Sequence, residues 1–394
     1  MPRTPIVLSA PVRTPIGKFG GALASLSAAD LGTAAAKACL ERSGIASERV
    51  DQVLFGHGRQ AGGGPNTARQ VGYRAGVPVD RPAFTINQAC GSGLQAVLSA
   101  ARTIQNGEAE VVLAGGAESM SNTPYLLPRA RWGYRMGSAE LTDGMYKDGF
   151  NDPLSGLVMG ETAEELAVEA GVDRTASDAW ALGSQGRCER ARKAGRFTAE
   201  IAPIEVPGKK GSVTLSTDEH PRDGVTPEEL AKLTPVFRPG GTVTAGNASG
   251  ITDGAAAILV SSEAAAAALG LTPVARLVDW EVVGVEPRIM GIGPVPACRK
   301  LLARQGMTGA EIEAVELNEA FASQVLACLK GLPFDPEIVN QDGGAIALGH
   351  PIGATGCRIL VTLLFGLAAR DQKRGIATLC VSGGMGLAAL VERF

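Results

Sequence analysis

Cys90 has the sequence setting of a nucleophilic thiol. It follows an apolar run at 83–87 that predicts a strand, and it precedes GSG at 91–93 and a predicted helix over 94–105. The N–H groups and positive dipole end at a helix start favour a thiolate, so we expect a lowered pKa. The glycines leave room for a substrate carbonyl and expose N–H groups for an oxyanion hole. Taken alone, the pattern also fits a buried structural cysteine.

His350 is a candidate base for this thiol. It lies in a glycine-rich segment, GGAIALGHPIGATG at 343–356, which is typical of a loop that positions a side chain. A histidine titrating near neutral pH can accept the thiol proton of Cys90. The alternative is a structural histidine braced by Pro351. The remaining histidines, His57 and His220, lack such a setting, and we interpret both as surface or packing residues.

Two further polar groups follow predicted strands. Cys380 comes after a strand at 376–379 and before two glycines, where a second reactive thiol suits proton transfer. Asn318 ends another predicted strand, where its amide can hold a water or a carbonyl oxygen. The alternatives are a core cysteine at a strand end and an ordinary helix cap.

These residues lie far apart in the chain, so the fold must bring them together. Short β-branched runs alternate with Ala-rich windows from residue 5 to about 120, which predicts an α/β layered domain with a buried sheet. A helix over 28–42 begins at Ser27, with Asp30 three residues later, and ends at Gly44. Further predicted strands cover 6–9, 53–56 and 110–115.

The middle of the chain has a different composition. Residues 121–249 are rich in Pro, Gly and charged residues and contain one amphipathic helix, near 161–169. Strand character resumes at 250–260, and 273–394 repeats the alternation of the first part. We therefore divide the chain into an N-terminal half (1–120 plus 250–272), an inserted loop domain (121–249) and a C-terminal half (273–394).

Composition excludes several classes of protein. Among 394 residues, 37 Lys and Arg nearly balance 40 Asp and Glu, so no global field selects nucleic acid or an acidic membrane. The seven cysteines are odd in number and form no CxxC pair, which argues against a disulfide framework or a zinc ribbon, and no metal ligands are apparent.

The apolar stretches do not predict a membrane protein. The stretch at 251–271 carries Asp253 and Glu263, and the one at 359–369 is too short to cross a bilayer. The first ten residues lack the pattern of a secretory signal, so we expect a cytoplasmic protein without a membrane-spanning helix.

Four ordered segments resemble the thiolase family. They are NQACGSGLQA at 87–96, NEAF at 318–321, the histidine segment at 343–356 and CVSGGMG at 380–386. The resemblance extends over the whole chain, through VRTPIGKFGG at 12–21, GGAESMS at 115–121 and GTVTAGNASGITDGAAA at 241–257. It implies a duplicated five-layered α/β/α/β/α thiolase fold with an inserted loop domain. It also suggests a homotetramer built as a dimer of dimers, or a homodimer.

The resemblance implies a function and a role for each candidate. The chain would be an acyl-CoA acetyltransferase that catalyses reversible Claisen condensation and CoA-dependent thiolysis of 3-ketoacyl-CoA by a ping-pong route. Cys90 would carry the acyl group, and His350 would accept its proton. With a water held by Asn318, His350 would also cradle the thioester oxygen. Cys380 would remove the α proton, and the backbone N–H groups of Cys90 and Ser382 would form the oxyanion hole.

Substrate contacts follow from the same resemblance. The substrates would be acetyl-CoA, 3-ketoacyl-CoA and CoA, with no permanently bound cofactor and no nucleic-acid or membrane partner. The expected binding residues are Met159, Arg222, Phe237, Ser249, Met290, Ala320 and Phe321. Lys209, Lys210 and Arg222 lie in a polar stretch that can meet CoA phosphates, although a solvated basic face fits equally well.

Two departures from the family pattern bear on specificity. Short-chain biosynthetic members carry His-Met-Gly where this chain has Val158, Met159 and Gly160, which favours a degradative or broad-range enzyme of fatty acid β-oxidation. Ser382 replaces a frequent glycine, which matters only if its φ must be positive.

The alternatives to a thiolase are a decarboxylating ketoacyl synthase, which usually pairs its cysteine with two histidines or His and Asn, and a non-catalytic acyl-CoA or lipid-binding relative. The second would be expected to lose Cys90, His350 or Cys380, which are all present.

Overall fold

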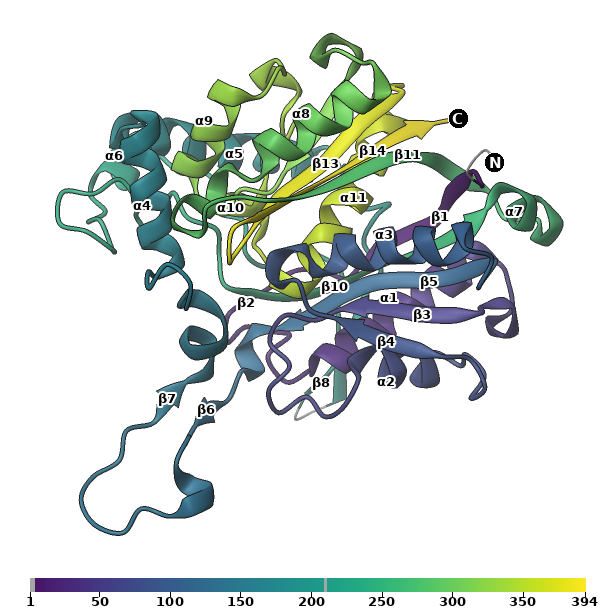
Figure 1. Ribbon diagram of the computed structural model, residues 1–394, viewed down its shortest axis with the longest axis horizontal. Helices are drawn as coiled ribbons and strands as arrows, with labels where there is room; N and C mark the ends of the chain where they lie inside the picture. Colours follow the sequence, from purple (N-terminus) through teal and green to yellow (C-terminus); the bar gives the residue numbers. More distant parts are fainter. Residues whose placement is uncertain (1–3, 209–210) are drawn as a thin grey trace.

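The computed structural model describes residues 4–208 and 211–394, and it places five layers on top of one another (Figure 1). Helices α3 (Ser92–Gln105) and α11 (Ile352–Ala369) form the middle layer between two β layers. One buried cluster joins these helices to both β layers. A second joins α1 (Ala28–Ser43) and α2 (Thr67–Arg74) to the N-terminal strands, and a third joins α8 (Pro294–Gln305) and α9 (Ala322–Gly331) to the C-terminal strands. This is the predicted α/β/α/β/α arrangement.

The N-terminal half contributes β1 (Ile6–Arg13), β2 (Gly17–Lys18), α1 (Ala28–Ser43), β3 (Gln52–Gly56), α2 (Thr67–Arg74), β4 (Ala83–Ile86), α3 (Ser92–Gln105), β5 (Val111–Ser119), β10 (Thr252–Ser262) and α7 (Glu263–Leu269). The C-terminal half contributes β11 (Pro273–Gly284), α8 (Pro294–Gln305), β12 (Ala314–Leu317), α9 (Ala322–Gly331), α10 (Ala345–Leu348), α11 (Ile352–Ala369), β13 (Arg374–Val381) and β14 (Met385–Arg393). The segment between them contains β6 (Tyr125–Leu126), β7 (Thr142–Asp143), α4 (Met159–Ala170), α5 (Arg174–Lys193), β8 (Ile204–Gly208), β9 (Gly211–Leu215) and α6 (Pro227–Ala231).

The two halves have the same strand connectivity. In the first, β3 lies parallel to β4 and β5, and β10 is antiparallel to β5. In the second, β12 lies parallel to β13 and forms a parallel bridge to Val339, and β14 is antiparallel to β13. Strand β1 pairs with both β10 and β11, so backbone hydrogen bonds continue from one half into the other. Strand β10, which lies within residues 250–272, thus pairs directly with β5.

Local signals placed several elements correctly. The predicted capping box of α1 is present, with Ser27 and Asp30 bonded reciprocally, and Gly44 ends the helix at φ 72°. Strand β5 is longer than the predicted 110–115, because Gly116 pairs within the sheet and allows α11 to approach. A Cβ at Gly116 would lie 2.1 Å from the carbonyl oxygen of Gly353. Glycine therefore continues this strand for a packing reason that local propensity does not contain.

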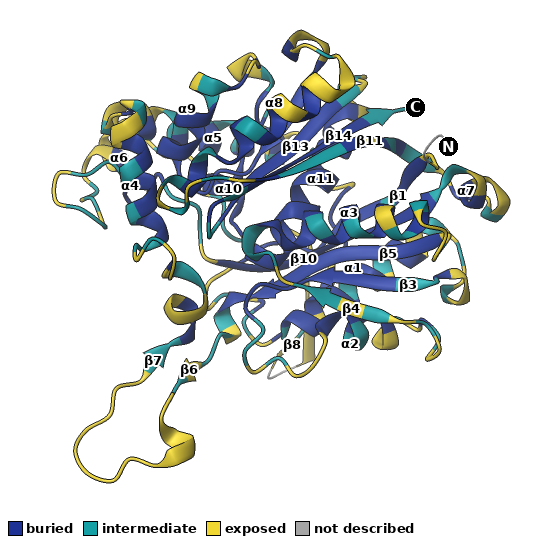
Figure 2. Cartoon of the chain, viewed as in Figure 1, coloured by how far each residue is buried: buried dark blue, intermediate teal, exposed yellow. Residues whose placement is uncertain are grey.

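Helix α11 is the central element of the core. It is longer than the predicted apolar stretch, and by length and composition it alone among the described residues could span a membrane. Yet 83% of it is buried inside the protein, which is typical of a core helix. Figure 2 shows α11 and the strands around it as buried, whereas the arm that carries β6 and β7 is exposed.

Candidate active site

Helices α3 and α11 cross so closely that their N-terminal ends meet. A Cβ at Gly93 would lie 2.9 Å from the carbonyl oxygen of Gly353, and one at Gly356 would lie 2.4 Å from the backbone nitrogen of Leu94. Only glycine permits this approach. Cys90 immediately precedes α3 and His350 precedes α11, so the crossing brings together two residues that are 260 positions apart.

A strained turn presents Cys90. Ala89 has φ 43°, in the left-handed region that alanine rarely adopts. The Ser92 hydroxyl donates to the Ala89 carbonyl at 2.7 Å and accepts the Gln88 N–H at 2.8 Å, while Asn87 accepts the Ala89 N–H at 3.0 Å. Such over-determined strain is typical of functional positions. The turn holds the cysteine at the wall of a cavity.

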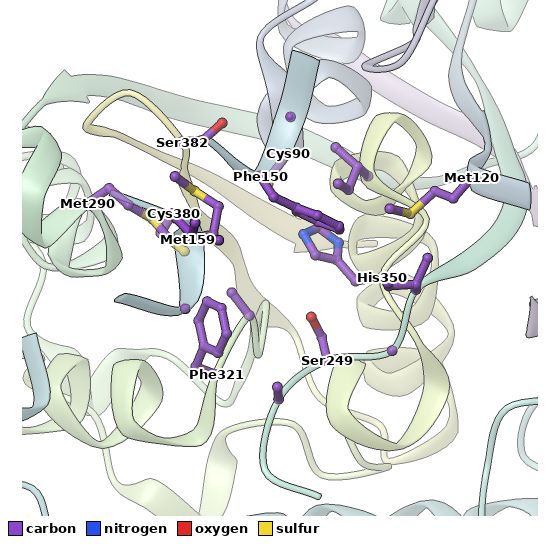
Figure 3. Close-up of a pocket in the computed structure, with 18 of the residues that line it drawn as sticks. Cys90, Met120, Phe150, Met159, Ser249, Met290, Phe321, His350, Cys380 and Ser382 are labelled. Atoms are coloured by element: carbon purple, nitrogen blue, oxygen red, sulfur yellow. The ribbon is translucent and has the colours of Figure 1, made fainter. Parts of the chain in front are cut away.

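The cavity has a volume of about 870 Å³, which includes open solvent at its mouth. Figure 3 shows Cys90, His350, Cys380 and Ser382 around it. Its remaining lining is mostly apolar and includes one charged residue, Arg59; the others are Met120, Tyr146, Gly149, Phe150, Val158, Met159, Gly160, Phe237, Ala248, Ser249, Gly250, Ile251, Met290, Ala320, Phe321 and Ile352.

The hydrogen bonds of His350 define which ring nitrogen can act as a base. The Thr355 hydroxyl donates to the Pro351 carbonyl at 3.0 Å, so at 2.6 Å it accepts the Nδ1–H of His350. Nε2 therefore carries the ring's lone pair and can accept a proton. The amide nitrogen of Asn318 lies 3.5 Å from this Nε2. The structure thus places Asn318 against His350, although Asn318 does not itself line the cavity.

Buried polar contacts fix the NEAF segment. Asn318 follows β12, and its N–H donates to Thr378 of the parallel neighbour β13 at 3.0 Å, so Asn318 and Cys380 lie at the same end of the sheet. The adjacent Glu319 carboxylate accepts hydrogen bonds from Trp180 and Ser184 of the inserted segment. This carboxylate therefore joins that segment to the end of the sheet that carries the candidate residues.

The turn after Cys380 supplies a backbone donor. Gly383 and Gly384 have φ of 84° and 83°, whereas Ser382 is absent from the described non-glycine residues with positive φ. The serine therefore costs no backbone strain here. The backbone N–H groups of Ser382 and of Cys90 itself point to the Cys90 sulfur and act to lower its pKa. These are the two donors predicted for the oxyanion hole.

The ionisation states differ from two of our expectations. Burial raises the pKa of the Cys90 thiol above its usual value, outweighing the positive charge of Arg59 and the backbone donors. Burial, aided by Arg358, lowers the pKa of His350 to about 3. The predictions that the pKa of the Cys90 thiol is lowered and that His350 titrates near neutral pH were therefore wrong. Burial of the site has a larger effect on the thiol pKa than the helix end has. The resting pair is a neutral thiol beside a neutral imidazole.

Cys380 is also a neutral thiol at rest. Burial raises its pKa well above the ordinary value, and the neighbouring Cys90 raises it further. A thiolate formed here is a strong base, since basicity increases with pKa.

Most of the predicted substrate residues line the cavity. Those that do are Met159, Phe237, Ser249, Met290, Ala320 and Phe321. Arg222 does not: it is exposed, and its N–H donates to the Gln185 side chain at 3.3 Å. Lys209 and Lys210 lie outside the described residues.

Sequence reasoning missed several residues at the site. Arg59, Tyr146 and Phe150 line the cavity, and no motif marked them. His57 is buried, and its Nε2 lies 3.3 Å from the carboxylate of Glu118. In the sequence, the only indication of the His57–Glu118 pair was that Glu118 lies in the family-like segment 115–121.

The Glu118 carboxylate connects two walls of the site. It accepts the N–H groups of Gly58 and Gly353 at 3.0 and 2.8 Å, and that of Arg59 at 3.1 Å. Burial would raise its pKa, but His57, Arg59 and the backbone donors hold it below the usual range. Within residues 4–208 and 211–394, no group of three or more His, Cys, Asp or Glu side chains could hold a metal ion.

Known proteins share both the sequence and the fold. The family model "Thiolase, N-terminal domain" matches residues 6–264, and "Thiolase, C-terminal domain" matches residues 271–393. An acetyl-CoA acetyltransferase of Cupriavidus necator is 50% identical over 391 residues, which cover 99% of this chain and 100% of the relative.

Two solved structures have nearly the same backbone. The acetyl-CoA acetyltransferase of Bacillus anthracis has a TM-score of 0.97 at 44% identity, covering 100% of this chain and 99% of that one. Human mitochondrial 3-ketoacyl-CoA thiolase in complex with CoA has a TM-score of 0.96 at 44% identity, covering 99% and 98%. These matches confirm the resemblance and the fold class predicted from the motifs.

Proposed function

We propose that this chain is an acyl-CoA acetyltransferase that works through an acyl group on Cys90. The chain belongs to the thiolase family. The observation that carries this proposal is a single cavity lined by two thiols, an imidazole with a defined tautomer and the backbone of Ser382. Family membership disfavours the ketoacyl synthase alternative, and retention of all three reactive side chains disfavours a non-catalytic relative.

The first half-reaction acylates Cys90. Nε2 of His350 accepts the thiol proton as the sulfur attacks the thioester carbonyl of acyl-CoA. The N–H groups of Cys90 and Ser382 stabilise the resulting oxyanion. The carbon–sulfur bond to CoA breaks, and the CoA sulfur takes the proton from His350. Because the thiol pKa is raised, this base is needed at neutral pH.

The second half-reaction forms a carbon–carbon bond. Cys380, which is neutral at rest, first gives its proton to water and regains one when the cycle ends. As a thiolate it takes the α proton of acetyl-CoA, whose thioester oxygen lies near His350 and Asn318. The carbanion attacks the acyl carbon on Cys90 and the carbon–sulfur bond breaks. Cys380 then returns the proton to the Cys90 thiolate. Thiolysis of 3-ketoacyl-CoA is the same sequence in reverse.

Thiolysis and condensation assays test this function. We expect 3-ketoacyl-CoA and CoA to yield acetyl-CoA and a shortened acyl-CoA, and acetyl-CoA alone to yield some acetoacetyl-CoA. A preparation that is fully folded by circular dichroism but catalyses neither reaction would exclude the proposal.

Chain length is expected to depend on Val158. It lines the cavity with Met159 and Met290, whereas histidine would add bulk and polarity there. Each buried methylene of substrate contributes about 0.8 kcal/mol, so two more correspond to roughly tenfold in kcat/KM. We expect the wild type to accept chains longer than four carbons and Val158→His to lower the six-to-four-carbon ratio of kcat/KM about tenfold. The exposed Val168→His is the matched control. Equal ratios in wild type and Val158→His would show that Val158 does not set chain length.

We also propose that a second copy of the chain covers the arm that carries β6 and β7. Trp132 and Met136 on this arm are 84% and 96% exposed, which is unusual for large apolar side chains. Light scattering should therefore give the mass of a dimer or tetramer rather than 40.4 kDa, and Met136→Asp should reduce it. A monomeric wild type at micromolar concentration would contradict this assembly.

A further inference from the structure

Among the described residues that line the catalytic cavity, Arg59 is the one charged side chain, apart from groups that can take part in the proposed reaction. It follows β3, lines the cavity together with Cys90 and Phe150, and is only 6% exposed. Its charge acts on the Cys90 thiol, lowering its pKa, so the guanidinium lies near the reacting sulfur. None of the proposed steps uses it.

Among the described residues the guanidinium belongs to no ion pair, although its charge also acts on the Glu118 carboxylate. Within the same part of the chain its Nε has no hydrogen-bond partner. The nearby Glu118 carboxylate already accepts hydrogen bonds from three backbone N–H groups and lies against His57. The guanidinium contacts an aromatic ring instead, since its central carbon lies 5.7 Å from the Phe150 ring centroid. A cation on a ring face is only partly compensated for burial.

The opposite wall is shaped to admit this side chain. A Cβ at Gly149 would lie 1.9 Å from an Nη atom of Arg59, so any larger residue at 149 would displace the guanidinium. The position next to Phe150 therefore accommodates a buried cation rather than filling the space with an apolar side chain. A buried, unpaired guanidinium calls for an anion, and its planar donors fit a carboxylate in a bidentate manner.

We propose that Arg59 binds a carboxylate at the far end of the acyl chain, so that the preferred substrates are 3-ketoacyl-CoAs derived from dicarboxylic acids. This inference rests on the proposed function. The acyl carbonyl must lie at Cys90, and the acyl chain must extend from there into the cavity that Arg59 and Phe150 line. The phosphates of CoA are separated from the thioester by the whole pantetheine arm, so they do not reach a residue that acts on the Cys90 sulfur.

Thiolysis of matched substrate pairs tests the proposal. We would compare kcat/KM for 3-ketoadipyl-CoA with 3-ketohexanoyl-CoA, and for 3-ketosuberyl-CoA with 3-ketooctanoyl-CoA, since each pair has equal carbon number. For at least one pair the wild type should prefer the carboxylated member by tenfold or more. Arg59→Leu should shift that preference about 100-fold towards the neutral member, mainly by loss of the carboxylated one. Arg59→Lys should retain part of the preference, and the exposed Arg299→Leu should leave it unchanged.

The outcomes separate this inference from the proposed function. If the wild type cleaves neutral substrates as well as or better than carboxylated ones in both pairs, Arg59 does not select a carboxylate. The same holds if Arg59→Leu lowers both members of a pair alike. If the wild type cleaves none of the four substrates and no acetoacetyl-CoA, the proposed function itself fails. Circular dichroism and the Cys90 acetyl adduct would show that the Arg59 variants are folded.

Discussion

Cys380→Ala is expected to form the acetyl adduct on Cys90 at a near-normal rate while losing condensation and thiolysis by about 10³-fold or more. The physical reason is the division of work in the cavity. Acylation needs only Cys90, the Nε2 of His350 and the backbone donors, whereas carbon–carbon bond formation needs a base for the α proton. Cys380 is the side chain whose raised pKa gives its thiolate that basicity.

The rate of Cys90 acylation, measured after rapid quenching, and the rate of steady-state turnover should be determined on the same preparations. The matched control is Cys298→Ala, which removes another fully buried free thiol from a cluster away from the cavity. Turnover within a few-fold of wild type in Cys380→Ala would remove Cys380 from the mechanism. Loss of the Cys90 adduct in that variant, with the fold intact, would show that the two thiols do not act separately.

His350→Asn is expected to slow acylation of Cys90 by about 10²- to 10⁴-fold, the usual contribution of a positioned base. Because the thiol pKa is raised, little thiolate forms without that base. Thr355→Val keeps the imidazole but removes the acceptor for Nδ1–H. Its acylation rate should fall only about tenfold, because the imidazole can then also adopt the tautomer that is protonated on Nε2. Acetylation rates followed by mass spectrometry compare the three proteins.

The pH dependence of acylation follows from the lowered pKa of His350. Its neutral, basic form is present above the folded pKa of about 3 and is lost only as pH falls through that value. The wild-type rate should therefore show no acid limb with a midpoint near 6.5, the value of an exposed histidine. A clear inflection near 6.5 that disappears in His350→Asn would contradict the neutral resting state.

The sequence predicted what depends on local rules and on ordered motifs. Ser27, Asp30 and Gly44 defined α1 because capping involves only neighbouring residues. Asn318 and Cys380 were each predicted to follow a strand, and the structure places both at one edge of the sheet because β12 and β13 are parallel. Residues that line the cavity on adjacent elements, such as Met290 and Phe321, came from the family resemblance rather than from periodicity.

Properties that arise from three-dimensional packing could not be predicted. The thiol pKa of Cys90 depends on its burial beneath α11 and the Ser382 turn, and the helix end alone suggested the opposite sign. Arg59 lies in a glycine-rich loop that resembles a surface turn until the structure places it at the cavity. The exposure of Arg222 likewise follows from the path of the inserted segment.

The central claim is that Cys90 carries the acyl group, and one measurement tests it directly. The wild type and Cys90→Ala would each be incubated with acetyl-CoA, and intact mass and proteolytic peptides would be recorded after rapid quenching. The mechanism predicts one acetyl group per wild-type chain, located on the peptide that contains Cys90, and none on Cys90→Ala. An acetyl group on another residue in the wild type, or turnover by Cys90→Ala at the wild-type rate, would contradict it.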